Sequence, residues 1–290
     1  MIELIALVVT VLGIVLSYPS IRKQWRDHVS QSDAKNLNNA FSSVLERKTL
    51  KVGCIPYPPF INYQRTGKKH SIDEGYYKTL FDALGRENGL EIEYIPVRND
   101  WSLDYLQSNK VDVIACLLRT PERIRKADFA ITLHTVSMNG VSRSDDLRIQ
   151  EKEHLRRDDI RVVAVEGESG QEALRDYGIS KETSPLQLIE TDDVSSIFKM
   201  VQAGLADVAI SDGLACLEYM NSEEGEGCSL RLLFEENPLL VSACGLMIKA
   251  EEPDLKKWLF EEVTKAREIP AVLTAENALI SEYGEVVHRI

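Results

Sequence analysis

Residues 111–130 of the chain read VDVIACLLRTPERIRKADFA and carry its clearest fold signal. The apolar run at 111–116 predicts a strand that is buried on both faces, as in a parallel sheet. Thr120 and Pro121 then suit the start of a helix, because a threonine side chain caps free backbone amides and proline fits the first helical position. A buried strand followed by a helix start is the repeating unit of parallel α/β sheets.

The sequence before this stretch has the same character. Residues 50–55 predict a strand, which the proline-rich segment 56–59 ends. A helix is predicted over 75–88, a second strand over 91–95, and a further helix over 101–107. With the strand at 111–116, this is the βαβαβ order of a parallel sheet.

The same order begins again further along the chain. Strands are predicted over 160–165, 186–190 and 207–211, with a helix over 171–177 between the first two and another around Ile197. The sequence therefore predicts an α/β fold with two similar lobes arranged one after the other.

Two segments connect the predicted lobes. One lies near residues 132–143, and the other is the apolar stretch 239–250, which is too long for one ordinary strand. Helices are predicted after it, over 253–268 and 270–283. Two crossing segments are what a hinge between lobes requires. We predict that lobe 1 comprises residues 48–134 and 245–290, and that lobe 2 comprises residues 135–244.

Composition narrows the classes of function. The formal net charge of −12 argues against nucleic-acid partners, because phosphate backbones bind basic surfaces. The five histidines and five cysteines show no metal-ligand spacing, so we predict neither a metal site nor a cofactor. Three cysteines lie in apolar runs and suit a core. The other two, Cys216 and Cys228, flank a polar loop and would be able to pair in an oxidising compartment, and the sequence leaves this open.

The amino terminus differs from the rest. Residues 2–18 are almost wholly apolar and predict a retained transmembrane anchor over 1–20, followed by a linker and lead-in helix over 21–47. Glu3 precedes the apolar run, whereas a cleaved signal peptide would have positive charge there. Basic residues at 22–26 favour a cytoplasmic location for the side that follows, so the topology stays open.

Three stretches, taken together, resemble a known family. They are LKVGCIPYPPF (50–60) with the helix start at 75–77, the stretch 111–130, and AGLADVAISD (203–212). In their order and spacing they resemble the family 3 extracellular solute-binding proteins, over roughly residues 45–285. This resemblance implies the type II periplasmic-binding fold, which the ligand-binding cores of ionotropic glutamate receptors share, and a ligand bound between two lobes.

The resemblance also implies a set of ligand-binding residues. Arg123 matches the arginine that grips a ligand carboxylate, and Asp212 matches the aspartate that pairs with an ammonium group. Ser169 matches a second carboxylate-binding position, Tyr57 an aromatic over the ligand, and Trp101 an apolar cleft position. Each has a structural alternative: a surface arginine, helix caps at Asp212 and Ser169, and ordinary core or rim aromatics.

The chain departs from the family pattern next to the arginine. Thr120 belongs to the implied site, but Cys116 and Leu118 stand where the family usually has hydroxyl side chains. Glu166 and Glu168 add negative charge beside Ser169, in what should be an anion pocket. These departures allow a cationic ligand, weak binding, or a ligand that is not an α-amino acid.

The predicted function is therefore a membrane-tethered, extracytoplasmic solute-binding protein for an amino-acid-like or small carboxylate ligand, serving an ABC-type permease. One alternative is a sensing module that signals to a membrane partner. A less favoured one is an enzyme resembling prephenate or arogenate dehydratases, with Glu166 or Glu168 as general acid.

Overall fold

The computed structural model describes residues 39–66, 69–182, 186–189, 191 and 193–290. The predicted anchor and most of the predicted linker lie outside these residues. Among the residues that the structure describes, no helix combines the length and the apolar character needed to cross a membrane. The chain divides into two compact units, Met1–Lys48 and Thr49–Ile290.

The first unit contains helix α3 (Ala40–Arg47). The Asn39 side chain begins this helix by accepting a hydrogen bond of 2.7 Å from the backbone amide of Ser42. Lys48, with φ of 53°, ends it in the left-handed conformation. The predicted lead-in helix is present.

The second unit is built on one sheet with the strand order β4-β1-β5-β11-β6-β9-β7-β8. The strands are β1 (Thr49–Cys54), β4 (Glu91–Pro96), β5 (Val113–Leu118), β6 (Ala127–Arg143), β7 (Val162–Val165), β8 (Leu186–Ile189), β9 (Val208–Asp212) and β11 (Leu240–Lys249). Strand β1 pairs in parallel with β4 and β5, and β7 pairs in parallel with β8 and β9. Both predicted parallel units are therefore present, at the two ends of the sheet.

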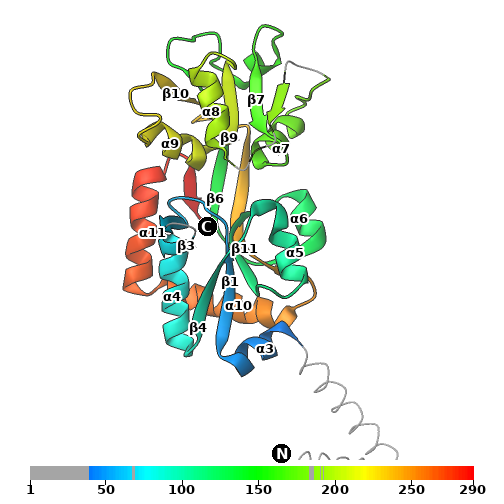
Figure 1. Ribbon diagram of the computed structural model, residues 1–290, viewed down its shortest axis with the longest axis vertical. Coiled ribbons are helices and arrows are strands. Elements are labelled where there is room, and N and C mark those ends of the chain that lie inside the picture. The colour runs from blue at the N-terminus through cyan, green and yellow to red at the C-terminus, as the bar shows by residue number, and fades with distance from the viewer. Residues whose placement is uncertain (1–38, 67–68, 183–185, 190, 192) are drawn as a thin grey trace, which may run out of the picture. The chain divides into compact units, whose positions relative to one another are not determined.

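Strands β6 and β11 join the two parallel units (Figure 1). They pair antiparallel along most of their length, with bulges near Cys244 and Leu246. The stretch predicted to be too long for one strand is a single strand of 10 residues, and β6 is longer still, at 17 residues. Strand β6 can be this long because its first part pairs with β11 and its last part with β9. Strand β11 pairs with β6 along its whole length and with β5 along its second half.

Helices cover the two parallel units separately, and we call each unit with its helices a lobe (Figure 1). Lobe 1 contains β1, β4, β5 and helices α4 (Tyr76–Asn88), α5 (Ser102–Gln107), α6 (Pro121–Lys126), α10 (Pro253–Arg267) and α11 (Pro270–Tyr283). Lobe 2 contains β7, β8, β9 and helices α7 (Ser169–Asp176), α8 (Ser195–Gln202) and α9 (Gly213–Asn221). This is the two-lobed periplasmic-binding fold.

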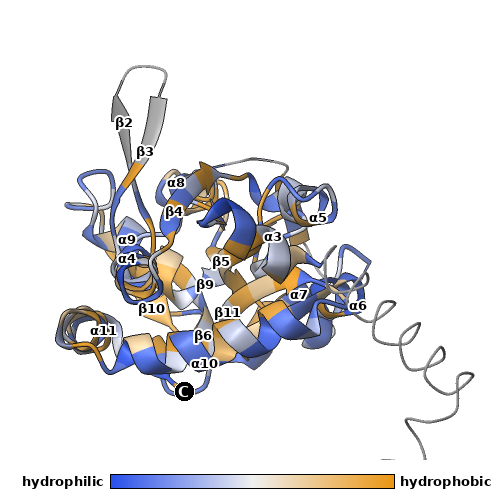
Figure 2. Cartoon of the chain, turned by 90° about the horizontal axis from the view of Figure 1, so that it is seen from below, coloured by the Kyte–Doolittle hydropathy of each residue, from blue (hydrophilic) through white to orange (hydrophobic). Residues whose placement is uncertain are grey.

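The helices are amphipathic, and α10 is a clear example. Leu255, Leu259 and Val263 recur at a helical spacing and are fully buried. Figure 2 shows hydrophobic and hydrophilic residues alternating along this helix. The buried face packs against β6 and α4, which fixes the helix on lobe 1.

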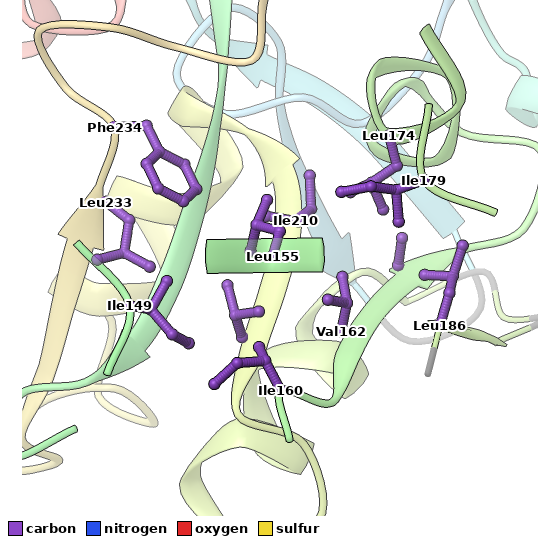
Figure 3. Close-up of a cluster of buried hydrophobic side chains, with 12 residues drawn as sticks. Ile149, Leu155, Ile160, Val162, Leu174, Ile179, Leu186, Ile210, Leu233 and Phe234 are labelled. Atoms are coloured by element: carbon purple, nitrogen blue, oxygen red, sulfur yellow. The ribbon is translucent and has the colours of Figure 1, made fainter. Parts of the chain in front are cut away.

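Lobe 2 has an apolar core of its own (Figure 3). Val162 and Ile210 from the sheet pack with Leu174 of α7, and Phe234 and Ile149 extend the cluster. Burying one such side chain contributes roughly 1.5–3 kcal/mol relative to leaving it exposed. The lobe is therefore stabilised independently of the contacts that it makes with lobe 1.

Several elements were not predicted. They are the hairpin of β2 (Asn62–Thr66) and β3 (Lys69–Glu74), the short helices η1 (Asn99–Trp101) and η2 (Lys152–Arg156), and the strands β10 (Leu230–Leu233) and β12 (Val287–Arg289), which both pair with β6. Helix α7 begins at Ser169, two residues before the predicted start, with Glu168 at the cap position and no side-chain capping bond. The helix-cap alternative for Ser169 is therefore wrong. All five cysteines, including buried Cys216 and exposed Cys228, are free thiols.

Candidate functional site

Arg123 lies in lobe 1, in the first turn of α6. The Thr120 side chain caps this helix by accepting a hydrogen bond of 3.3 Å from the Arg123 amide, and Pro121 occupies the first helical position, as predicted. The guanidinium folds back over the end of β5, where Nη1 donates to the Leu118 carbonyl at 2.9 Å. Burial lowers the pKa of Arg123, and the negative charge of Glu168 opposes this shift. The group remains a cation held in a fixed orientation.

The second nitrogen of Arg123 reaches a residue that sequence analysis did not single out. Nη2 donates to the Asn99 side-chain oxygen at 2.7 Å. The amide nitrogen of Asn99 in turn donates to the Glu168 carboxylate at 2.6 Å. Because Asn99 belongs to η1 of lobe 1 and Glu168 precedes α7 of lobe 2, this amide connects the two lobes.

Asp212 lies at the end of β9 in lobe 2. Its carboxylate caps α9 by accepting a hydrogen bond of 2.9 Å from the Ala215 amide, as the helix-cap alternative predicted. The same oxygen accepts a second bond of 2.7 Å from the hydroxyl of Tyr57, which belongs to lobe 1. Burial raises the pKa of Asp212, and these hydrogen bonds only partly offset that effect. Asp212 thus caps α9 and also contacts lobe 1 through Tyr57.

Tyr57 is held in position by its own segment. Its backbone amide and carbonyl pair with Ile61 at 3.1 and 2.9 Å, and its ring lies 5.5 Å from that of Phe60. Burial, together with the nearby negative charge of Asp212, raises the pKa of Tyr57 well above its usual value. The phenol therefore stays protonated and acts as a hydrogen-bond donor to Asp212.

The remaining predicted residues contribute in different ways. Cys116 and Leu118 are buried on β5, and the Cys116 sulfur lies 3.5 Å from that of Cys244 on β11. Burial raises the pKa of Cys116 well above its usual value, so this thiol is neutral. Ser169 is the first residue of α7, next to Glu168. The Trp101 side chain is 52% exposed, and its ring faces the guanidinium of Arg98 at 5.8 Å.

Within lobe 2, α7 packs closely on β9. Gly170 lies in the first turn of α7, and a Cβ atom built there would lie 2.3 Å from the Ile210 carbonyl oxygen. Only glycine allows this distance. The contact holds the amino end of α7 beside the end of β9, so that Glu168, Ser169 and Asp212 lie on the same side of lobe 2.

Comparison with known proteins identifies the family. A probable amino-acid ABC transporter-binding protein of Haemophilus influenzae is 25% identical over 249 residues, which are 85% of this chain and 81% of that protein. A crystal structure of the ancestral amino acid-binding protein AncCDT-1, a precursor of cyclohexadienyl dehydratase, matches with a TM-score of 0.67 at 20% identity and covers 84% of this chain and 99% of its own. A histidine kinase sensor domain with similarity to periplasmic binding proteins matches with a TM-score of 0.66 at 19% identity, over 79% of this chain and 95% of its own.

At these identities the two solved structures show the fold alone. The family itself follows from the model of the bacterial extracellular solute-binding proteins, family 3, which matches residues 50–269. This match contains β1 except its first residue, the segment around Arg123, and Asp212. The chain belongs to the family 3 bacterial extracellular solute-binding proteins.

Proposed function

We propose that this protein binds a small amino-acid-like or carboxylate ligand between its lobes, with Arg123 and Asp212 as the two charged poles. The observation that carries the proposal is that lobe 1 presents a fixed guanidinium and lobe 2 a buried carboxylate. A guanidinium matches a carboxylate with two parallel hydrogen bonds, and a carboxylate attracts an ammonium group. The Haemophilus relative, named a probable amino-acid ABC transporter-binding protein, supports the same class of ligand.

The other predicted residues fit around these poles. Ser169 and the first amides of α7 would receive a carboxylate, because the amino end of a helix favours anions. The Tyr57 ring would cover the ligand while its hydroxyl stays on Asp212. Thr120 and the Leu118 carbonyl hold Arg123 through hydrogen bonds, and Cys116 lies on the same strand as Leu118.

Closure of the lobes would use the two long strands as the hinge. We retain the predicted hinge segments near 132–143 and 239–250 and the predicted lobe boundaries. Segment 132–143 lies in β6, and segment 239–250 spans β11. Strand β11 pairs with β5 of lobe 1, β6 pairs with β9 of lobe 2, and the two strands pair with each other. Small-angle scattering should show a smaller radius of gyration when ligand saturates the protein, and an unchanged radius would contradict closure.

We further propose an extracytoplasmic location, with residues 2–18 as a membrane anchor and an ABC permease as the partner. The likeness to a histidine kinase sensor domain keeps signalling to a membrane partner as the alternative. The dehydratase-like enzyme, with Glu166 or Glu168 as general acid, stays the less favoured alternative.

Calorimetric titration with amino acids and small carboxylates tests the binding proposal. Removing Arg123 would leave a ligand carboxylate buried and unpaired, at a cost of about 2–5 kcal/mol, so Arg123→Ala should bind more than about thirtyfold more weakly. Arg123→Lys should also bind poorly, because one ammonium cannot replace the planar fork. Asp212→Asn should weaken binding of amines while sparing ligands without an ammonium group.

Arg125→Ala is the matched control, since Arg125 is an exposed arginine of the same helix. It should bind like the wild type. A ligand that Arg123→Ala binds as tightly as the wild type does would refute the assignment of Arg123. Unfolding of Arg123→Ala in the absence of ligand would make the residue structural.

A further inference from the structure

Two thiol groups contact each other on neighbouring strands of the sheet. The Cys116 sulfur on β5 lies 3.5 Å from the Cys244 sulfur on β11, although the two residues are 128 positions apart in the chain. The sulfurs of Cys54 and Cys228 contact main-chain carbonyl oxygens instead, at 3.7 and 3.8 Å. The contact of Cys116 with Cys244 therefore brings together two groups that a disulfide bond would join.

The backbone is irregular where these two thiols meet. In the pairing of β5 with β11, Cys244 lies opposite Leu118 rather than Cys116, and the register shifts after Gly245. Cys116 has φ of 58°, in the left-handed region that residues other than glycine rarely adopt. Such a conformation is retained only where the surrounding structure holds it, and it is frequent at functional sites. The outlier therefore favours a functional role for Cys116.

The lobes cover this thiol pair while they are in contact. Cys116 is only 4% exposed, and Cys244 is fully buried. Burial raises the pKa of Cys116, and the negative charge of Asp212 is a further cause, so this lobe 2 carboxyl lies near the thiol. Asp212 is itself joined to lobe 1 by the hydrogen bond from Tyr57. Because a cysteine reacts as an accessible thiolate, separation of the lobes is what would make the pair reactive.

We propose that Cys116 and Cys244 form a redox-sensitive dithiol, which a disulfide oxidant converts into an intrachain disulfide when the lobes separate. One cysteine loses its proton, and its sulfur attacks the oxidant, which forms a mixed disulfide and releases one thiol. The second cysteine loses its proton and attacks the mixed disulfide, so that the bond between the two cysteines forms and a second thiol leaves. The cysteines lose two electrons and two protons, which reduce the S–S bond of the oxidant to two thiols.

The disulfide would connect two functional parts of the protein. A disulfide bond is about 2.05 Å long, so the two sulfurs must approach each other by about 1.5 Å. Strand β5 also carries Leu118, whose carbonyl holds the Arg123 guanidinium, and β11 is one of the two proposed hinge strands. The cross-link would therefore fix the arginine side of the site to the hinge. The role of lobe opening rests on the proposed function, whereas formation of the disulfide does not.

The first experiment treats the reduced wild type with bis(2-hydroxyethyl) disulfide in the absence of ligand. The remaining thiols are blocked with iodoacetamide, and mass spectrometry of a proteolytic digest identifies linked peptides. We expect a species that joins the Cys116 and Cys244 peptides, lacks two hydrogen atoms, and is separated again by dithiothreitol. Exposed Cys228 should form a mixed disulfide with the reagent and is the positive control. Absence of the linked species in a sample in which Cys228 has reacted would overturn the inference.

The second experiment measures how lobe opening changes the rate of cross-linking. Tyr57→Phe removes the hydrogen bond to Asp212 that joins the lobes, so the linked species should form at least about threefold faster than in the wild type. Tyr94→Phe is the matched control, because its hydroxyl also donates to a carboxylate at 2.7 Å, but to Asp82 of the same lobe. It should cross-link at the wild-type rate.

Equal rates in the wild type and Tyr57→Phe, or the same acceleration in both variants, would overturn the proposed exposure of the pair by lobe opening. Neither result, nor an absent cross-link, changes the outcome of small-angle scattering and calorimetry with ligand, which test closure and binding. Failure of this inference and failure of the proposed function are therefore distinguishable.

Discussion

Substitution of Gly170 by alanine should damage the packing that orders lobe 2 of the proposed site. The new Cβ would lie 2.3 Å from the Ile210 carbonyl oxygen and 3.0 Å from its carbon, both main-chain atoms of β9. Ordinary contacts of this kind are about 3.5 Å, so helix and strand would have to separate by about 1 Å. No rotamer change relieves the clash, because both partners are backbone.

Two effects of this substitution oppose each other. Overpacking costs about 1–3 kcal/mol. Alanine in place of glycine returns up to about 1 kcal/mol through helix propensity. Because the clash is between main chains, we expect overpacking to win by about 1–2 kcal/mol. For a protein of this size each kcal/mol lowers the melting temperature by about 2–4 °C, so the expected decrease is about 2–8 °C.

Thermal unfolding followed by far-ultraviolet circular dichroism measures this decrease. The control is Arg175→Ala on the same helix, where the side chain is 66% exposed and pairs with Glu172. It should change stability by less than about 0.5 kcal/mol. A melting temperature of Gly170→Ala equal to or above that of the wild type would refute the close packing of α7 on β9.

Three further substitutions probe single contacts. Tyr57→Phe keeps the ring packing on Phe60 but removes the hydrogen bond to Asp212, which is worth about 1.5–3 kcal/mol. Calorimetry should therefore show that ligand affinity falls about tenfold or more. An unchanged affinity would show that this bond does not favour closure. Burial raises the pKa of the Asp212 carboxyl, so this group destabilises the folded wild type as pH rises. Asparagine does not titrate, so the free energy of unfolding of Asp212→Asn in urea, relative to the wild type, should increase from about pH 4 to pH 7. A decrease over this range would contradict the assignment. Burial alone would raise the pKa of Asp207, yet hydrogen bonds, first of all those from Arg161, hold this pKa well below its usual range. The free energy of unfolding of Asp207→Asn should therefore be about 3–5 kcal/mol lower than that of the wild type near pH 7, and the difference should become smaller below about pH 4. A difference that does not depend on pH would exclude the ionic origin.

The sequence predicted the elements whose signals are local. Apolar runs located both parallel units of the sheet, and Thr120 with Pro121 located the start of α6. The helices over 253–268 and 270–283 were predicted within one residue of α10 and α11, because their apolar residues recur at a helical spacing. Such patterns are visible in one sequence because each element buries one face.

Elements that depend on distant partners were missed. Strand β12 has three residues, and its position is set by pairing with β6 far back in the chain. Helix α7 was predicted to begin at Gln171, since residues 167–170 were interpreted as a turn, and Ser169 had a helix cap as its structural alternative. The structure instead begins the helix at Ser169, where Gly170 lets the first turn approach Ile210 of β9. Tertiary packing overrode the local signal.

The same difference between local signals and contacts of distant residues applies to the candidate site. Arg123, Asp212, Ser169 and Tyr57 were named through a family resemblance, and the structure joins two of them directly through the Tyr57–Asp212 bond. Asn99 had no sequence signal, because its role depends on Glu168, 69 residues away, and on contact between lobes. Only coordinates show such a bridge.

The departure at Cys116 and Leu118 gains a physical meaning from this geometry. The hydroxyls usual at these positions would contact a ligand directly, whereas here one thiol packs on Cys244 and Leu118 offers its carbonyl to Arg123. Because the β5 side of the site supplies no side-chain hydroxyl at these two positions, recognition would depend on charged groups and on the Asn99 amide. Charged contacts discriminate between ligands by net charge and its position more than by shape.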